Sequence, residues 1–350
     1  MFFTSDNAAG VHPDILAAVG RAGAGPAMAY GADPLTVRVE ARLREVFEAP
    51  EARAYLVATG TAANALALAC LCPPWGTVYA HQGSHIENDE CAAPEFFTGG
   101  AKLTLIGGAD ARIDAAELAE KIRIATPHGV HNVQNGALSI TQATERGAIY
   151  PLDDIARLTA IARAAGIGVH MDGTRFANAV ARLGCSPAEA SWKAGVDILC
   201  LGATKNGAMA AEAVVIFDPA KAWEFELRRK RGGHLFSKMR FVAAQMDAYL
   251  TDGLWLTMAG NANAMADRLA AGIASASGAR VLNTVEANMI YAEFPLGLHR
   301  RLQQAGARYY PAVGGQDETG PDDAPYTVRL VASFETTEAE VDRFVEVLRG

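Results

Sequence analysis

Two short apolar segments, each ending abruptly in polar residues, constrain the fold more than any other feature of the chain. The first reads Gly168-Val-His-Met-Asp172, and the second reads Ile198-Leu-Cys-Leu-Gly202 and continues into Ala-Thr-Lys205. Short apolar runs bounded by glycine are typical of buried strands in a parallel sheet. The chain between them is long enough for one crossover connection, so both strands can belong to one sheet. We therefore expect Asp172 and Lys205 at the carboxyl ends of two strands, where open α/β sheets bind their ligands.

A carboxylate and a lysine in this arrangement suit pyridoxal phosphate. Lys205 would form the Schiff base with the cofactor aldehyde, and Asp172 would keep the pyridine nitrogen protonated so that the ring acts as an electron sink. The alternative is a surface lysine and a helix-capping aspartate with no shared role. We favour the cofactor hypothesis because both residues occur together with the same flanking pattern.

Strand and helix patterns alternate between residues 55 and 217, which predicts an α/β fold with a mostly parallel sheet and helices on both faces. Beyond Pro219 the pattern changes and predicts a smaller α+β domain. We expect an N-terminal arm over 1–30, a large cofactor-binding domain over 31–240 and a small C-terminal domain over 241–350. Helices are predicted over 34–48, 59–71, 114–124, 153–165, 175–183, 187–194, 296–305 and 337–348, and strands over 55–58, 77–80, 102–106, 136–141, 167–171, 197–201, 213–217, 288–294 and 327–331.

Composition excludes several classes of function. The net charge of −8 gives no basis for binding nucleic acid or an anionic membrane. The five cysteines are too few and too scattered for a disulfide framework, which favours reduced thiols and a cytoplasmic location. The sequence shows neither a signal peptide nor an apolar window of membrane-spanning length. Nucleotide-binding glycine motifs are also missing, so we expect a small-molecule substrate.

The strand-to-helix junction Thr59-Gly60-Thr61 is a candidate phosphate site. Free N–H groups and the positive end of a helix dipole attract anions, although an ordinary helix cap explains the same residues. Thr204 could bond the same phosphate beside Lys205. His85 follows a predicted strand end and could lie flat on a pyridine face, with a structural histidine as the alternative.

Two arginines could hold a substrate carboxylate. Arg175 follows Asp172 by three residues, and Arg329 is the only charge in the apolar strand Thr327–Val331. A planar guanidinium binds a carboxylate through two parallel hydrogen bonds, and a structural ion pair is the alternative for each arginine. Ser5 in the arm could add a hydroxyl to this clamp.

A metal site is the less favoured interpretation of the histidines. His81, His85, Glu87 and Glu90 have a His-x-x-x-His spacing that would suit zinc on a helix. However, Ser84-His-Ile is predicted to be a loop, and no third ligand follows at a typical spacing. We therefore expect no metal.

Taken together, these motifs resemble those of the low-specificity L-threonine aldolases, pyridoxal-phosphate enzymes of the beta-eliminating lyase type with the aspartate aminotransferase fold (fold type I). The stretches occur in the family's order across nearly the whole chain, and they are specific as a set. They are Ser5-Asp6-Asn7, Tyr30-Gly-Ala-Asp-Pro34, Ala58-Thr-Gly-Thr-Ala-Ala-Asn64, Ser84-His-Ile86, His170-Met-Asp-Gly-Thr-Arg175, Gly202-Ala-Thr-Lys-Asn-Gly207 and Val328-Arg-Leu330.

The resemblance implies roles for individual residues. Lys205, His85 and Asp172 would be catalytic, with Lys205 carrying the cofactor and His85 covering the ring. The resemblance also implies a homotetramer, a dimer of dimers with sites at subunit interfaces, in which Tyr30 and the basic segment around Arg229 and Lys238 serve a neighbouring subunit. The implied cofactor-binding residues are Thr59, Gly60, Thr61, His85, Asp172, Arg175, Thr204, Lys205 and Lys238, and the implied substrate-binding residues are Ser5, Tyr30, Arg175 and Arg329.

One departure from the family concerns the general base. Many members carry a histidine in Glu-Asn-Thr-His-Asn after the strand equivalent to 138–141, whereas this chain reads Thr141-Gln-Ala-Thr-Glu145, with Thr144 nearest to that histidine. A water held by His85, or His131 folded inward, are alternatives that the sequence leaves open, and nothing aligns His128 with the role.

The activity implied is reversible retro-aldol cleavage of L-threonine, L-allo-threonine and related L-3-hydroxy-α-amino acids to glycine and an aldehyde. Other interpretations remain at this stage. The chain could catalyse β-elimination or another pyridoxal-phosphate reaction on the same scaffold, prefer aromatic aldehydes as a phenylserine-type aldolase, or bind the cofactor without catalysis. A metal-dependent aldolase is the remaining alternative.

Overall fold

A seven-stranded sheet forms the centre of the large domain in the computed structural model, which describes residues 1–350 apart from the side chains of residues 126–128. The strand order is β1-β7-β6-β5-β4-β2-β3, and β7 runs antiparallel to both of its neighbours while β6, β5, β4, β2 and β3 pair in parallel. The strands are β1 (Arg53–Val57), β2 (Gly76–His81), β3 (Lys102–Ile106), β4 (Gln134–Thr141), β5 (Gly168–Gly173), β6 (Ile198–Gly202) and β7 (Glu212–Ile216).

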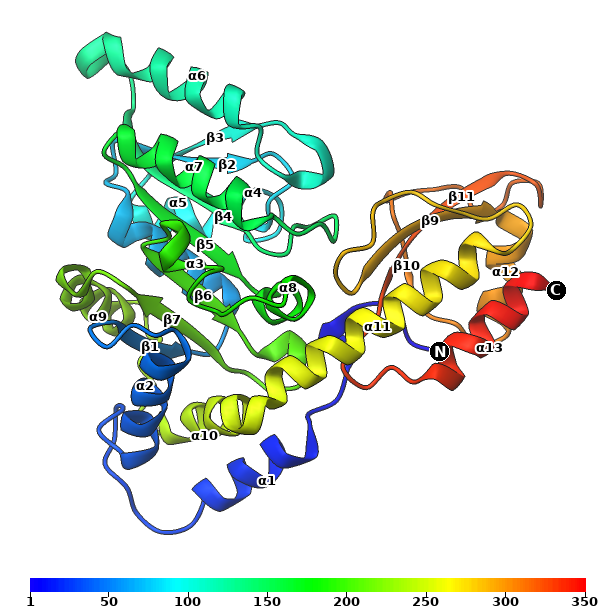
Figure 1. Ribbon diagram of the computed structural model, residues 1–350, viewed down its shortest axis with the longest axis horizontal. Helices are drawn as coiled ribbons and strands as arrows, with labels where there is room; N and C mark the ends of the chain where they lie inside the picture. The colour runs from blue at the N-terminus through cyan, green and yellow to red at the C-terminus, as the bar shows by residue number, and fades with distance from the viewer.

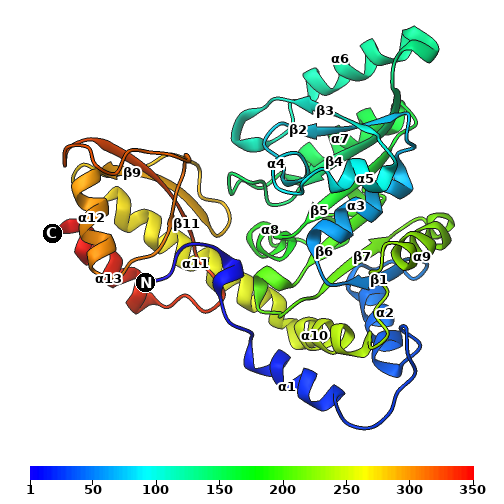
Figure 2. The ribbon, with the colours of Figure 1, turned by 180° about the vertical axis from the view of Figure 1, so that it is seen from behind.

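Helices cover both faces of this sheet. One face, in front in Figure 1, carries α6, α7 and α8, and the opposite face, in front in Figure 2, carries α3, α5 and α9. Helix α3 is apolar almost all round because it packs between the sheet and its neighbouring helices. The helices are α2 (Pro34–Val46), α3 (Gly60–Leu71), α4 (His85–Asn88), α5 (Ala93–Thr98), α6 (Ala115–Ala125), α7 (Leu152–Ala164), α8 (Phe176–Leu183) and α9 (Ala222–Arg231).

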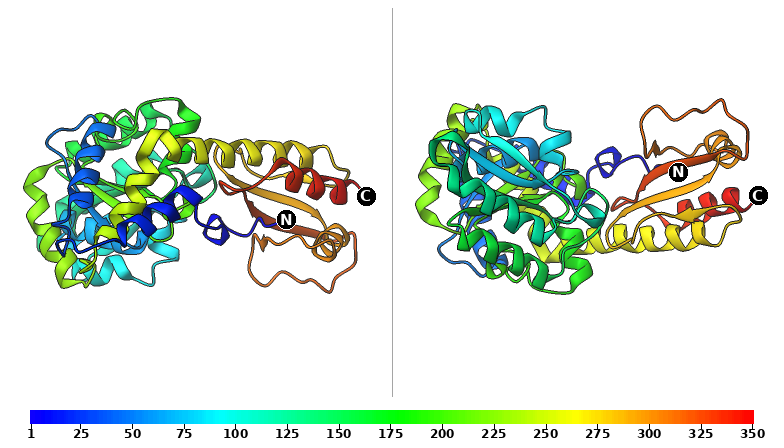
Figure 3. Two further views of the ribbon diagram at one scale, coloured as in Figure 1. Left: turned by 90° about the horizontal axis from the view of Figure 1, so that it is seen from below. Right: turned by 90° about the horizontal axis from the view of Figure 1, so that it is seen from above.

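The smaller part contains an antiparallel sheet of order β10-β11-β9-β8. Helix α11 (Leu254–Ala274) runs from one part to the other, with Trp255 in the core of the large domain and Met265 in that of the small one (Figure 3). The N-terminal part of α11 therefore belongs to the core of the large domain and its later part to the core of the small domain. The domain boundary at 240/241 stays a prediction. The remaining elements are α10 (Arg240–Leu250), β8 (Arg280–Val281), β9 (Met289–Pro295), α12 (Leu296–Gln304), β10 (Tyr310–Pro311), β11 (Pro325–Val331) and α13 (Glu338–Arg349).

The N-terminal arm ties the two parts together. Phe3 lies in the core of the small domain, where its backbone N–H donates to Arg308 O at 2.7 Å and its carbonyl accepts from Val331 N at 2.9 Å. The arm then passes through η1 (Asp6–Ala8), and the His12 N–H donates to Gly207 O at 2.9 Å, next to the segment that carries Lys205. The arm is thus anchored at both ends, beside the strand ends where the site was predicted.

Three local predictions are wrong. The arm was expected without periodic structure, but α1 (Pro13–Ala22) forms there; its signal is weak because only Ile15 and Ala22 are buried. The helix predicted over 187–194 is a series of turns ending in η4 (Trp192–Ala194), in which the Trp192 indole donates to Phe47 O at 2.7 Å. His85 begins the one-turn helix α4, where a loop was expected.

Among the described residues, no helix has the length and apolar character needed to cross a membrane.

Replacement of Phe3 by alanine is expected to destabilise the protein. The side chain is fully buried and packs edge-to-face on Phe344, with ring centroids 5.4 Å apart, so its loss leaves a cavity costing about 3–5 kcal/mol. Urea unfolding should show this change for Phe3→Ala. Phe2→Ala is the matched control because Phe2 is 63% exposed, and equal destabilisation by both changes would contradict the role assigned to Phe3.

Candidate active site

Asp172 lies at the end of β5 as a buried, ionised carboxylate. Its Oδ1 accepts hydrogen bonds from Thr174 N at 3.0 Å and Thr174 Oγ1 at 2.7 Å, and its Oδ2 accepts from Asn64 Nδ2 at 3.1 Å. Burial raises the pKa of Asp172, but the bonds from Thr174 and the charges of His170 and His85 outweigh it, so that the pKa lies below its ordinary value. The group therefore offers a negative charge to a cation at the strand end.

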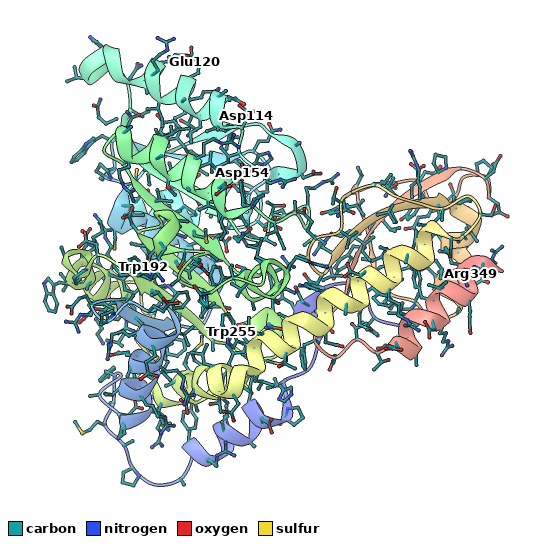
Figure 4. All side chains as sticks on the ribbon, in the orientation of Figure 1. Asp114, Glu120, Asp154, Trp192, Trp255 and Arg349 are labelled. Atoms are coloured by element: carbon teal, nitrogen blue, oxygen red, sulfur yellow. The ribbon has the colours of Figure 1, made fainter. Side chains whose placement is uncertain are left out.

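Lys205 reaches the same edge of the sheet because β5 and β6 approach closely at their ends. A side chain at Gly202 would meet the Thr174 carbonyl oxygen at 2.5 Å, so only glycine allows this approach. Lys205 follows in η5 (Thr204–Asn206). The adjacent Asn206 donates to Tyr249 Oη at 3.0 Å and to the carbonyl of Trp255 at 2.9 Å, which pins the segment to the start of α11, where Figure 4 labels Trp255.

Two further carboxyl groups lie in the electrostatic range of Lys205. Glu212, the first residue of β7, is buried and accepts from Ala203 N at 3.2 Å through Oε2. Burial raises the pKa of Glu212 to about 7, against the opposing effect of the Lys205 charge. The same positive charge lowers the pKa of Asp6 in the arm, although burial of Asp6 acts in the other direction.

His85 is held from behind by a buried glutamate. Its Nδ1 lies 2.8 Å from Glu90 Oε1, which also accepts from Asn64 Nδ2 at 2.8 Å. The hydrogen bond to Glu90 is the largest cause of a raised pKa at His85, and the charge of Asp172 adds to it. Asn64 thus links the carboxylates of Glu90 and Asp172, which places His85 beside Asp172.

Three of the four predicted phosphate residues lie at the N-terminus of α3. Thr59 caps this helix, accepting from Ala62 N at 3.2 Å, and Gly60 lies next to the Thr174 hydroxyl. Thr61 is half-buried in the first turn. Thr204 accepts from Ala211 N at 3.1 Å, which fixes the turn before Lys205. The helix N-terminus and the Lys205 segment are therefore both adjacent to Thr174.

Arg175 is already paired with a carboxylate of its own chain. Its Nε lies 2.7 Å from Asp6 Oδ2 and its Nη2 lies 3.0 Å from Asp6 Oδ1, with both side chains buried. Asn288 Nδ2 donates to the same Oδ2 at 3.1 Å. Ser5 stands beside this pair, and its hydroxyl accepts from Asn7 N at 3.2 Å. The alternative of a structural ion pair is thus realised for Arg175.

Arg329 lines a cavity of about 520 Å³ between the two parts of the chain. Its Nε is buried and finds no partner among the described residues, so the guanidinium remains available to an anion. Glu145 and Tyr291 line the same cavity, from the loop after β4 and from β9 respectively. His81 also lines it, but Gly83 N donates to its Nδ1 at 2.9 Å and its Nε2 lies 3.2 Å from Gly108 O.

Two predicted residues lie on an exposed face of this chain. Tyr30 is 52% exposed, and the Lys230 ammonium lies 4.6 Å from the centre of its ring. Tyr30 N donates to Ser237 O at 3.0 Å, and the neighbouring Lys238 is exposed. Arg229 is instead buried, with Nη1 donating to Leu56 O at 3.3 Å, so it does not share this surface.

The candidates for the general base are placed differently. Thr144 is buried, and its hydroxyl donates to Asp110 O at 2.8 Å and accepts from Ala148 N at 3.1 Å. His131 is exposed before β4 begins, at the opposite end of that strand from Thr141, so it does not fold inward. The His128 side chain lies outside the described part of the structure.

The residues present fit pyridoxal phosphate. The ionised carboxylate of Asp172 can hold a protonated ring nitrogen, and the α3 N-terminus supplies N–H groups for a phosphate. Two buried oxygens near Asp172 lack a hydrogen-bond partner among the described residues, namely Asn64 Oδ1 and Glu90 Oε2. Such atoms are expected where a bound ligand completes the site. Within the same described part, no group of three or more potential metal ligands is found.

The sequence interpretation did not single out several residues of this site. Asn64, Glu90, Thr174 and Glu212 act through Asp172, His85 or Lys205. Asn64 and Thr174 lie inside the motifs that carry the family resemblance, and Glu90 was considered as a metal ligand, but none of the four was given a role in the cofactor site. A signal for Glu212 was available, because a glutamate opening the apolar strand Glu212–Ile216 is unusual unless it has a partner. The other three required the tertiary structure.

Glu212→Gln is expected to flatten the pH dependence of stability in the cofactor-free protein. The pKa of Glu212 rises from 4.5 to about 7 on folding, so its contribution is complete below pH 4.5 and is lost as the pH rises through 7, by about 3 kcal/mol. Urea unfolding at several pH values measures this loss. The same loss in the glutamine variant would show that another group causes it.

Comparisons with known proteins agree with this geometry. The Beta-eliminating lyase family model matches residues 3–294. The low specificity L-threonine aldolase of Pseudomonas sp. (strain NCIMB 10558) is 37% identical, covering 99% of this chain and 97% of the relative, and that of Pseudomonas aeruginosa is 40% identical, covering 89% of each.

Solved structures confirm the predicted fold. The threonine aldolase of Leishmania major superposes with a TM-score of 0.91 at 26% identity, covering 99% of this chain and 98% of the other. A serine palmitoyltransferase of Sphingomonas wittichii, with a TM-score of 0.70 at 15% identity, shares the fold over 100% of this chain and 86% of its own. The chain belongs to the beta-eliminating lyase family, lyases whose cofactor is pyridoxal 5'-phosphate.

Proposed function

We propose that this protein is an aldolase that cleaves L-threonine, L-allo-threonine and related L-3-hydroxy-α-amino acids reversibly to glycine and an aldehyde. The relatives named as low specificity L-threonine aldolases support this activity. The observation that carries it is the buried, ionised Asp172 at the end of β5, adjacent to the segment that presents Lys205 at the end of β6. That pair is what a pyridoxal-phosphate enzyme requires.

Lys205, Asp172 and His85 have separate roles in this proposal. When bound, the cofactor supplies an electron sink for the pair left by a broken bond at Cα. Lys205 would hold the cofactor aldehyde, Asp172 would keep the ring nitrogen protonated, and His85, fixed by Glu90, would lie against the ring. Thr59, Gly60, Thr61 and Thr204 would bind the phosphate.

The substrate carboxylate is assigned chiefly to Arg329. Its guanidinium faces the cavity, whereas Arg175 is occupied by Asp6. Ser5 and the Asp6–Arg175 pair lie beside the Lys205 segment, and they would orient the substrate so that the Cα–Cβ bond is aligned for cleavage. In this proposal Arg175 therefore lines the site as part of the ion pair with Asp6, and it is not the main ligand of the substrate carboxylate.

A homotetramer with sites at subunit interfaces is part of the proposal. Several large apolar side chains are exposed on this subunit around Tyr30 and α9, which a further subunit would cover. They include Met28, Tyr30, Val37, Trp223, Leu227 and Phe236. A cytoplasmic location is also proposed, and the five free cysteines support it.

Lys205→Ala should abolish glycine formation from L-threonine together with the visible absorbance of the bound cofactor. Asp172→Asn should keep the cofactor and lose about 10²- to 10³-fold in kcat, because the ring nitrogen loses its charged partner. Lys193→Ala is the control, since this surface lysine pairs with Glu48 and lies over the Trp192 ring, neither of which belongs to the proposed site. Ammonia and a keto acid in place of glycine and acetaldehyde would contradict the aldolase assignment.

Mixed oligomers test the shared site. Lys205→Ala and Lys238→Ala subunits should each have little activity alone, and co-expression should restore part of it, because some interfaces then combine an intact Lys205 with an intact Lys238 from different subunits. Sedimentation velocity should give the tetramer for both variants. A monomer, or no recovery in mixed tetramers, would argue against a site shared between subunits.

A further inference from the structure

The β-hydroxyl proton of the substrate needs an acceptor, and Thr144 does not supply one. Its hydroxyl proton is donated to Asp110 O at 2.8 Å, while Arg146 N and Ala148 N donate to its oxygen at 3.3 and 3.1 Å. These hydrogen bonds fix the conformation of the loop after β4. Thr144 is therefore a structural residue, and another group must accept the proton.

Glu145, the next residue, has its backbone fixed and its carboxylate free. The Tyr291 hydroxyl donates to Glu145 O at 3.0 Å, the Arg146 guanidinium lies 4.2 Å from the centre of the Tyr291 ring, and Asn283 Nδ2 donates to Arg146 O at 3.0 Å. The side chain of Glu145 lines the cavity with Arg329. No described residue forms a hydrogen bond or an ion pair with its carboxylate.

Electrostatic effects place the Glu145 carboxylate near both sides of the site. The hydrogen bond to Glu90 and burial have the largest effects on the pKa of His85, and the negative charge of Glu145 raises it further. The same charge also raises the pKa of Arg175. His85 adjoins Asp172, where the ring is assigned, and Arg175 adjoins the arm. A carboxylate that acts on both groups lies within electrostatic range of the assigned ring position and of the arm.

The geometry points to Glu145 as the catalytic base that accepts the β-hydroxyl proton, an inference that rests on the proposed aldolase function. The O–H bond breaks as its proton passes to Glu145, the oxygen electron pair forms the C=O bond of the aldehyde, and the Cα–Cβ bond breaks with its pair leaving toward Cα. Glu145 then releases the proton to water, and Cα takes one proton from water to complete glycine. The reverse sequence serves condensation.

Other groups on or near the cavity suit this role less well. Both ring nitrogens of His81 are engaged, by Gly83 N and Gly108 O. Nδ1 of His85 is bonded to Glu90, whose charge favours the protonated ring. Asp89 is a second cavity carboxylate without a hydrogen-bond partner among the described residues, but its charge is not among the main influences on His85 or Arg175. The titratable or charged groups that line the cavity with Glu145, or whose pKa its charge affects, are His81, His85, Asp89, Asp110, Arg146, Arg175, Tyr291 and Arg329.

Glu145→Gln keeps the shape of the side chain and removes its basicity. We expect kcat for L-threonine cleavage to fall by about 10²- to 10⁴-fold, and the acid-side fall of the wild-type pH profile to disappear. Glu145→Asp should recover part of the rate. Glu87→Gln removes an exposed carboxylate from α4 and is the control, with kcat and pH profile unchanged.

Glycine has no β-hydroxyl group, so its binding and exchange test the rest of the site without needing the base. Glu145→Gln should bind glycine and exchange its α-hydrogen with deuterated water at close to the wild-type rate. In the cofactor-free protein, NMR should show a lowered pKa of His85 in this variant because a nearby negative charge is lost.

The inference is overturned if Glu145→Gln cleaves L-threonine within threefold of wild type, or loses glycine exchange as fully as cleavage. It is also overturned if Asp89→Asn, rather than Glu145→Gln, removes the acid-side fall. Failure of the proposed function would look different, because wild type itself would then neither cleave L-threonine nor exchange glycine.

Discussion

Asp6 and Arg175 form a buried ion pair with two hydrogen bonds. The position of the arm relative to the sheet and the small domain depends on this pair. Asp6 comes from the arm, Arg175 follows β5, and Asn288, which donates to Asp6, precedes β9. Removing one member of a buried pair leaves an uncompensated charge at a cost of about 3–5 kcal/mol. The pair therefore holds the arm against the sheet edge, next to Lys205.

Buried carboxyl groups in the site differ in pKa because the balance between burial and hydrogen-bond donors differs from one to the next. Asp172 has donors from Thr174 and Asn64, which favour its ionised form. Burial outweighs the favourable contacts of Glu90 and Glu212, so their pKa values lie above the ordinary range. The surroundings thus set Asp172 apart as a fixed negative charge, and Glu212 as a group that can change its charge near neutral pH.

The cavity is formed by both parts of the chain, and this explains how the loop after β4 can work without the family's histidine. Tyr291 and Arg329 come from the small-domain sheet, whereas Glu145 comes from the large domain. The hydrogen bond from Tyr291 to Glu145 O joins the two. A carboxylate base, a free guanidinium and the sheet edge are brought together only when the domains pack as they do here.

The sequence by itself determined the sheet, the family and the strand ends at which Asp172 and Lys205 lie, because these depend on short-range patterns. Apolar strands that end in Asp172 and before Lys205 can be read directly, and the strand-to-helix junction at Thr59 follows the same logic. Element bounds agreed closely where apolar runs end sharply. Helix α1 was missed because few of its residues are buried.

Only the tertiary structure decided which charges face one another. Arg175 and Arg329 have equivalent signals in the sequence, yet one is occupied by Asp6, 169 residues away, whereas Nε of the other has no partner in the part of the chain that the structure describes. Glu90, Glu212 and Glu145 gain their roles from contacts between segments that are distant in sequence. Local patterns fix where a side chain lies along its strand or helix, but the partner that neutralises or orients it depends on how those elements pack.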